Sequence, residues 1–512
     1  MKQILKNTYI QILSLYAIAV LLIVIGIINK FALQFHIVAI LIPILGILAL
    51  ENKQKDLNFS KFLIPILFLI LILRIIPYLN NSIPLGYDAG IYKYAIETSL
   101  NNIPEWMITQ ITMEPLFLYL ASFLKLFLTS QIILTAVLII ITIILGIVIY
   151  LTTKEYFGKS VAIISTIVYA FSVIQFQAFS YMYYRNIIGI TLALLSFYFI
   201  KKGNTKLFIL FAVLTGAMHR PTFYLFGLSY LAFTITQIKT KNFKKYLISG
   251  IVILILTSLF YLGEFQNQIL IMFDPVLQGF MQPGESPGTF IDFFTYQYST
   301  LAYLPFALLG LFYLIKKKDF NLIFFWTIIS LIIVYFQFFF FNRFIIMLDI
   351  GLIILAGIGF SILISNYKKL GIIITIILLL SAGILITSEA LNTKPLISNN
   401  ELDAIKYLSN TEENAYVMAT YSLYSPYVLG YSNRKTIAPG LFDYDKHNQQ
   451  EWINFWRTND LNETKTFLNA YEKPLYIYIG AKQFDNIQQF SNSECFEIYY
   501  NLNNNKIYKY TC

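Results

Sequence analysis

Long apolar blocks separated by short polar loops fill the first three quarters of the chain. Because about 20 apolar residues cross a bilayer as a helix, blocks of this length predict membrane-spanning helices. About 13 crossings fit the pattern. They are residues 8–28, 31–50, 62–79, 131–151, 161–180, 187–200, two short helices within 207–238, and 247–262, 301–315, 320–340, 344–365 and 370–388. The sequence therefore predicts a polytopic α-helical membrane protein.

The composition agrees with this prediction, and the distribution of charge argues against a nucleic-acid partner. The chain is 57% hydrophobic and 12% charged, whereas a soluble domain carries about 25% charged residues. The net charge is +10, but residues 1–388 hold 26 Lys/Arg against 13 Asp/Glu and residues 389–512 hold 11 against 14. The basic excess thus belongs to the membrane part, where it orients helices. We expect no nucleic-acid partner.

The polar loops alternate in charge along the chain. Nineteen of the 26 basic residues in the membrane part fall on one side of the predicted crossings, together with the N-terminus. The positive-inside rule makes that side cytoplasmic and places the C-terminal segment outside. The apolar stretch 115–129 would invert every later loop if it crossed. We therefore predict a juxtamembrane helix on the outer surface, with Lys125 snorkelling to water.

Beyond Glu389 the chain becomes polar, and short helical and strand patterns alternate. Such alternation predicts a small α/β domain. We expect three parts: 1–61 with two helices and a cytoplasmic loop, 62–388 as the main transmembrane domain, and 389–512 as the extracytoplasmic domain. "CFEIYYNLNNNKIYKYTC" predicts a hairpin turning at Asn503–Asn504. This turn brings Cys495 opposite Cys512, and a disulfide there fits an oxidising compartment.

Ionisable residues on the outer face are few, so they are the first candidates for function. They are Asp88 in "PLGYDAGIYKYAIE", Glu114 in "MEPLFLY", Arg185 in "SYMYYRN", His219 and Arg220 in "HRPT", and Arg343 in "FNRF". Each has a structural alternative. Asp88 is placed to cap a helix and Glu114 to favour a helix dipole. Arg185 and Arg343 are placed to anchor the interface, and His219 to be a polar residue at a helix end. Arg74, inside an apolar block, is expected to snorkel. Together, a carboxylate and several arginines on one face suit an anionic lipid substrate.

These motifs resemble the GT-C superfamily of membrane glycosyltransferases, in particular the protein O-mannosyltransferases and the aminoarabinose transferases of lipid A. The resemblance covers roughly residues 62–388. It rests on "YD" followed by a small residue and "IY", and on "EPLFLYL" and "HRPTFYLF". The second outer loop departs from the family because it carries Arg185 and Asn186 where another Asp is frequent. That departure argues against a two-acid metal site.

The resemblance implies inverting transfer of a sugar from a polyprenyl-phosphate donor to a glycan, lipid or protein acceptor at the outer face. Asp88 would orient or deprotonate the acceptor. Arg185, Arg220 and Arg343 would neutralise the leaving lipid phosphate. Glu114 and His219 would be the ligands if a divalent metal ion takes part.

Two other functions fit a polytopic protein. A transporter or lipid flippase usually places its ionisable residues near the bilayer midplane, whereas here most lie at the outer mouth. A scaffold with an outer binding domain needs no carboxylate and arginines gathered on one face.

Overall fold

The computed structural model describes residues 62–98, 113–265, 291–338, 340–437, 446–482, 487–491 and 494–512. The predicted helices at 8–28 and 31–50 lie outside this part of the chain. The described residues form two compact units. The first is helical and contains residues up to Ile76, Glu114–Phe117 and the described part of Leu138–Thr393. The second contains Pro77–Met113, Leu118–Val137 and Lys394–Cys512, again as far as they are described.

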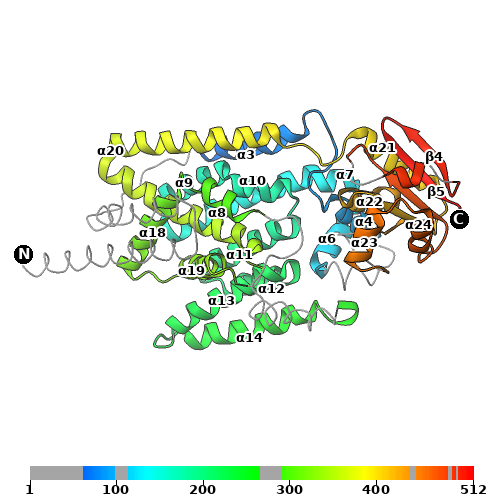
Figure 1. The fold of residues 1–512 in the computed structure, drawn as a ribbon. Coiled ribbons are helices and arrows are strands. Elements are labelled where there is room, and N and C mark those ends of the chain that lie inside the picture. The colour runs from blue at the N-terminus through cyan, green and yellow to red at the C-terminus, as the bar shows by residue number, and fades with distance from the viewer. Residues whose placement is uncertain are drawn as a thin grey trace, which may run out of the picture. The chain divides into compact units, whose positions relative to one another are not determined.

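Apolar helices build the first unit (Figure 1). They are α3 (Leu63–Ile75), α8 (Leu138–Phe157), α9 (Lys159–Phe171), α10 (Val173–Ser180), α11 (Tyr184–Lys201), α12 (Thr205–Met218), α13 (Arg220–Thr236), α14 (Phe243–Leu259), α17 (Phe293–Ser299), α18 (Leu304–Lys317), α19 (Leu322–Tyr335) and α20 (Ile345–Asn392). A helix α6 (Pro115–Lys125) begins in this unit. It falls within the stretch predicted as a juxtamembrane helix.

Three helical stretches among the described residues are long and apolar enough to cross a membrane: Ser130–Phe157, Phe341–Tyr367 and Lys369–Asn392. Two bent helix pairs, α9 with α10 and α17 with α18, raise that number to five if each pair is one span. The other predicted crossings from residue 62 onward also form helices, but shorter or more polar ones. The prediction of a helical membrane protein is confirmed, and the count of 13 stays a prediction.

Helix α20 supplies two of these spans because it folds back on itself (Figure 1). A Cβ atom on Gly371 would lie 2.5 Å from the Leu363 carbonyl oxygen, so the two arms touch beside the bend. This division of α20 into two spans agrees with the two crossings predicted at 344–365 and 370–388.

A buried carboxylate joins the two bent helix pairs to α20. Asp349 of α20 is fully buried and accepts hydrogen bonds from Ser172 Oγ (2.8 Å), Gln175 Nε2 (2.9 Å) and the Tyr303 hydroxyl. Ser172 lies at the 54° bend between α9 and α10, and Tyr303 directly precedes α18 of the pair bent by 81°. An ionisable group is costly inside a membrane protein unless several donors surround it. Asp349 therefore fixes both bends relative to α20.

Arg74 does not snorkel as the sequence suggested. Its side chain is fully buried, and its guanidinium carbon lies 5.8 Å from the ring centroid of Tyr169 and 5.5 Å from that of Phe176. Two aromatic faces stabilise the cation in place of water. The sequence pattern missed this because the rings belong to α9 and α10, about 100 residues later.

The second unit contains a five-stranded sheet of order β2-β1-β3-β5-β4 (Figure 1). The strands are β1 (Tyr416–Ala419), β2 (Lys435–Ile437), β3 (Leu475–Ile479), β4 (Phe496–Leu502) and β5 (Asn505–Tyr510). The first three are parallel, and β5 pairs antiparallel with β3 and β4. Helix α21 (Asn399–Tyr407) precedes the sheet, and the helices in the connections are α22 (Ser425–Ser432), α23 (Gln449–Arg457), α24 (Leu461–Leu468) and α25 (Gln488–Ser491). The predicted C-terminal α/β domain is confirmed.

The β4–β5 hairpin turns through Asn503 and Asn504, both with positive φ (53° and 62°). Consecutive residues of this kind form the tight turn that suits hairpin twist. Cys495 precedes β4 and is bonded to Cys512 across the hairpin, with Cα atoms 5.1 Å apart. The adjoining core contains Trp452, Phe467 and Ile477.

The second unit also contains α4 (Ala89–Thr98) and α7 (Ser130–Ile132). Both therefore belong with the sheet, although long stretches of chain separate them from it. This grouping places Asp88, one residue before α4, in the same compact unit as the C-terminal sheet.

Candidate functional site

A buried carboxylate is the centre of the candidate site in the first unit. Glu114 directly precedes α6, whose first residue is Pro115, and its side chain is 2% exposed. Proline suits the first helical position because its missing N–H leaves no donor unsatisfied there. Glu114 thus stands at the N-terminal end of a helix, as the sequence suggested, but its neighbours show that it does more than favour the dipole.

Two arginines contact the Glu114 carboxylate. Arg185 Nη1 forms an ion pair with Oε2, while Arg220 Nε lies 3.6 Å from Oε1 and the Arg220 backbone N–H donates to the same oxygen at 3.3 Å. Burial alone would raise the pKa of Glu114. The positive charges of Arg185 and Arg220 lower it instead, to about 2. Glu114 is therefore ionised and binds both arginines.

Three helix N-termini meet at this carboxylate. Arg185 lies in the first turn of α11, Arg220 is the first residue of α13, and Glu114 immediately precedes α6. The N-terminal end of a helix carries a partial positive charge and free N–H groups. Since two arginines face one carboxylate, the cluster keeps a net positive charge. A net positive cluster beside helix N-termini has the chemistry that attracts an anion.

His219 separates α12 from α13 with an extended backbone (φ −157°, ψ 108°). Its Nδ1 accepts from the Thr222 N–H at 3.3 Å and lies 2.7 Å from Thr222 Oγ1, so it caps α13. Burial lowers the pKa of His219 to about 3; the Glu114 charge opposes this shift, and Arg185 and Arg343 add to it. The ring is neutral. The predicted break at "HRPT" is confirmed, and the helix-end alternative describes what His219 does there.

Arg343 lies in a short helical turn (Phe341–Phe344) that leads into α20. Its guanidinium carbon is 5.3 Å from the ring centroid of Phe340, and its charge acts on His219. The charges of Arg185, Arg220 and Arg343 all act on His219, and the three arginines belong to the same unit. Sequence reasoning placed them on one face but gave no pairing.

A metal ion does not fit the Glu114–His219 pair. The carboxylate oxygens are already engaged by two arginines, which would repel a divalent cation, and His219 Nδ1 is used as a helix cap. Within the described ranges, no group of three or more His, Cys, Asp or Glu side chains is placed to hold a metal. In this structure Glu114 therefore forms ion pairs and His219 caps a helix, and a role for either as a metal ligand stays a prediction that this arrangement does not support.

Asp88 lies in the second unit. It is half-buried, and its carbonyl oxygen accepts the first helical hydrogen bond of α4, from Tyr92 N–H at 2.9 Å. Asp88 thus occupies the position of an N-cap residue. Its negative charge, after the larger effect of burial, raises the pKa of the neighbouring Tyr87 hydroxyl. Residues 86 to 93 contact the C-terminal domain repeatedly, and no sequence pattern predicted these contacts.

Sequence reasoning also missed Asp349 of the helical unit. The signal was present, because an aspartate inside the apolar run 344–365 is rare and usually has a role. Its three donors come from helices that are distant in sequence, so only the structure shows them.

The described helices and C-terminal domain form a GT-C fold, shared with membrane glycosyltransferases of known structure. The apo oligosaccharyltransferase of Archaeoglobus fulgidus matches 82% of this chain and 70% of its own, with a TM-score of 0.61 and 13% identity. ArnT from Cupriavidus metallidurans, bound to undecaprenyl phosphate, matches 88% of this chain and 97% of its own, with a TM-score of 0.57 and 10% identity. At such identity these likenesses describe the fold.

The chain belongs to the EpsG family, whose model matches residues 62–398. No curated protein sequence matches it significantly. The resemblance to GT-C membrane glycosyltransferases is confirmed at the level of the fold. The segment matched by the family model nearly coincides with the 62–388 range inferred from the motifs.

Proposed function

We propose that this protein transfers a sugar from a polyprenyl-phosphate donor to an acceptor hydroxyl on the outer face of the membrane, with inversion at the anomeric carbon. The observation that carries the proposal is the cluster of Glu114, Arg185 and Arg220. Its net positive charge, at three helix N-termini, suits the phosphate of a lipid-linked donor. The solved neighbours include ArnT bound to undecaprenyl phosphate and an archaeal oligosaccharyltransferase bound to dolichol phosphate.

In the proposed reaction, the acceptor oxygen attacks the anomeric carbon and the bond from that carbon to the phosphate oxygen breaks. The acceptor proton passes to the Asp88 carboxylate, which acts as general base. The leaving polyprenyl phosphate gains negative charge as this bond breaks. Because Arg185, Arg220 and Arg343 are already held in place, they stabilise that developing charge more than the substrate's own.

Glu114 holds the arginines in the proposed mechanism and takes no proton. Its pKa of about 2 keeps it ionised at any physiological pH. The carboxylate preorganises two cations that would otherwise repel each other. The mechanism uses no metal ion at Glu114 or His219.

Donor binding is tested by titrating the purified full-length protein in lipid nanodiscs with undecaprenyl phosphate. Arg220→Gln should weaken binding about 10- to 100-fold, the usual worth of a charged hydrogen bond. Arg185 still pairs with Glu114 in this variant, so the fold should persist. The matched control is Arg457→Gln, which changes an exposed arginine at the end of α23. Unchanged affinity in Arg220→Gln, Arg185→Gln and Arg343→Gln would refute the phosphate site.

A further inference from the structure

Helices α4 and α22 of the second unit touch through glycine. A Cβ atom on Gly90 of α4 would overlap the Pro426 carbonyl oxygen at the start of α22. A Cβ atom on Gly430 of α22 would overlap the Gly90 carbonyl oxygen. The two backbones are in direct contact, so any side chain at either glycine must push the helices apart. Gly90 lies two residues after Asp88.

Hydrogen bonds fix the chain just before Asp88 to the C-terminal domain. The Tyr427 hydroxyl, on α22, donates to the Gly86 carbonyl oxygen at 2.7 Å. Gly86 turns the chain with a positive φ of 78°. The Tyr87 hydroxyl donates to the Ser422 carbonyl oxygen at 3.3 Å, just beyond the carboxyl end of β1. Both residues that precede Asp88 are thus bonded to the C-terminal domain.

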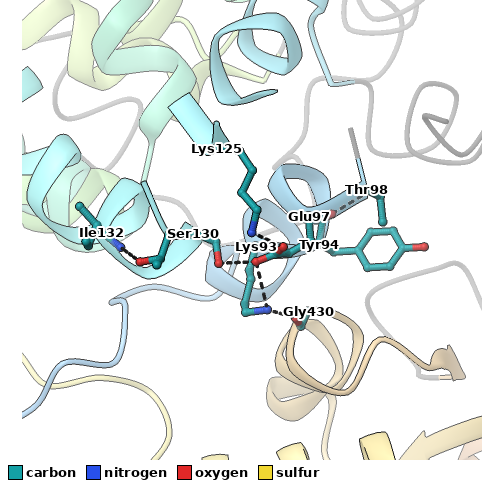
Figure 2. Close-up of polar contacts among 9 residues, drawn as sticks. Lys93, Tyr94, Glu97, Thr98, Lys125, Ser130, Ile132 and Gly430 are labelled. Carbon is teal, nitrogen blue, oxygen red and sulfur yellow. Dashed lines mark hydrogen bonds and ion pairs between the residues drawn. The ribbon is translucent and has the colours of Figure 1, made fainter. Parts of the chain in front are cut away.

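Lys93 adds a third connection, one turn after Gly90. Its Nζ donates to the Gly430 carbonyl oxygen at 2.9 Å (Figure 2). The same atom lies 4.9 Å from the ring centroid of Tyr431. A cation near the C-terminal end of α22 also complements its dipole. The side chain therefore binds α22 by charge as well as by its hydrogen bond.

The far end of α4 is fixed separately. The Glu97 carboxylate forms an ion pair with Lys125 of α6 and accepts a hydrogen bond from Ser130 Oγ of α7 at 2.6 Å (Figure 2). Lys93 Nζ lies 3.8 Å from the same carboxylate. Lys125 is thus an ion-pair partner of α4, a contact that the snorkelling expectation did not include. Contacts thus hold helix α4 at both ends. Those with α22 hold its N-terminal end, next to Asp88.

We propose that the C-terminal domain is a positioning module for the Asp88 loop, with Gly430 and Tyr427 of α22 as the positioning residues. The inference rests on the proposed function, in which Asp88 is the general base. It assigns the domain a task in the reaction: α22 holds the carboxylate where an acceptor hydroxyl can reach it. A displacement of about 1 Å in such a group is enough to cost about 100-fold in rate.

The test uses two α22 variants, Tyr427→Phe and Gly430→Ala, each expressed as the full chain in a strain lacking the gene. Expression is lowered until incorporation of the sugar into surface glycan is proportional to protein amount. Incorporation per folded protein should fall at least about tenfold. Undecaprenyl phosphate binding by the purified variants should stay within about twofold of the parent, because the arginine cluster is untouched.

Matched controls separate positioning from folding. Tyr510→Phe also removes one tyrosine hydrogen bond in this domain, to Asn469 Oδ1 at 3.1 Å, but on strand β5 and not on α22. Gly227→Ala adds a methyl where nothing lies within 4 Å. Both should retain full incorporation.

The outcomes distinguish the two proposals. If Tyr427→Phe and Gly430→Ala lower only the amount of folded protein, with incorporation per molecule unchanged, the positioning role is wrong. If Asp88→Asn retains full incorporation, the proposed function fails and the positioning role fails with it. Loss in Asp88→Asn with full incorporation in both α22 variants would overturn the positioning role alone.

Discussion

Arg220 Nε lies 3.6 Å from Glu114 Oε1, although 106 residues separate the two along the chain. The pair brings the start of α13 to the start of α6, and Arg185 adds the start of α11. A carboxylate that is 2% exposed needs such partners, because an unpaired buried charge costs several kcal/mol. The ion-pair cluster is therefore a structural centre of the helical unit, and it is also the feature on which the proposed binding of the donor phosphate rests.

Glu114→Gln should destabilise the protein strongly. The variant keeps the shape of the side chain but removes the negative charge that faces Arg185 and Arg220. Breaking a buried pair in this way costs about 3–5 kcal/mol. Thermal unfolding of the purified protein in detergent should show a clearly lower Tm.

The control for this prediction is Asp403→Asn. Asp403 forms an exposed pair with Lys406, 3.9 Å apart, with side chains 69% and 53% exposed. Exposed pairs contribute little, so its Tm should match the parent. A Glu114→Gln protein as stable as Asp403→Asn would show that the buried cluster is not needed for folding.

The stability conferred by Glu114 should depend on pH with a definite sign. Its pKa in the folded protein is about 2, below the usual 4.5. A lowered pKa gives stability that is fully present above 4.5 and is lost as the pH falls toward 2. The Tm difference between the parent and Glu114→Gln should therefore shrink between these values. A difference that is constant from pH 6 to about 3 would contradict the ion-pair account.

His219→Asn should be tolerated better than His219→Ala. Asparagine is a good N-cap, whereas alanine leaves the Thr222 N–H of α13 without its acceptor and costs about 1 kcal/mol. Comparison of Tm and of glycan incorporation for the two variants checks this. If asparagine and alanine abolish incorporation equally while Tm is unchanged, His219 has a chemical role that capping does not explain.

Local features of this site were predictable from sequence. Glu114 before Pro115, the break at His219 and the helix start after Asp88 follow from capping and proline rules that involve only neighbouring residues. The Asn503–Asn504 turn is local in the same way. The predicted positions and the observed helix and strand ends agree at these places.

The pairings were not predictable in the same way. Nothing near Arg185 in the chain indicates Glu114 as its partner, and nothing near Gly90 indicates Gly430. Such contacts depend on how helices pack across hundreds of residues. Composition carried a weaker signal: a carboxylate and arginines confined to one face suggested that they would meet. Arg74 shows the limit of such reasoning, because its partners are aromatic rings and carry no charge pattern.

The central claim is that the protein is a glycosyltransferase whose reaction needs the Asp88 carboxylate. The most direct test is the mass of the surface glycan in a strain lacking the gene, complemented with the parent, Asp88→Asn or Asp403→Asn at equal protein amounts. We predict that the parent and Asp403→Asn restore one sugar unit that the deletion lacks, and that Asp88→Asn does not. A glycan of unchanged mass in the deletion strain, or full restoration by Asp88→Asn, would contradict the claim.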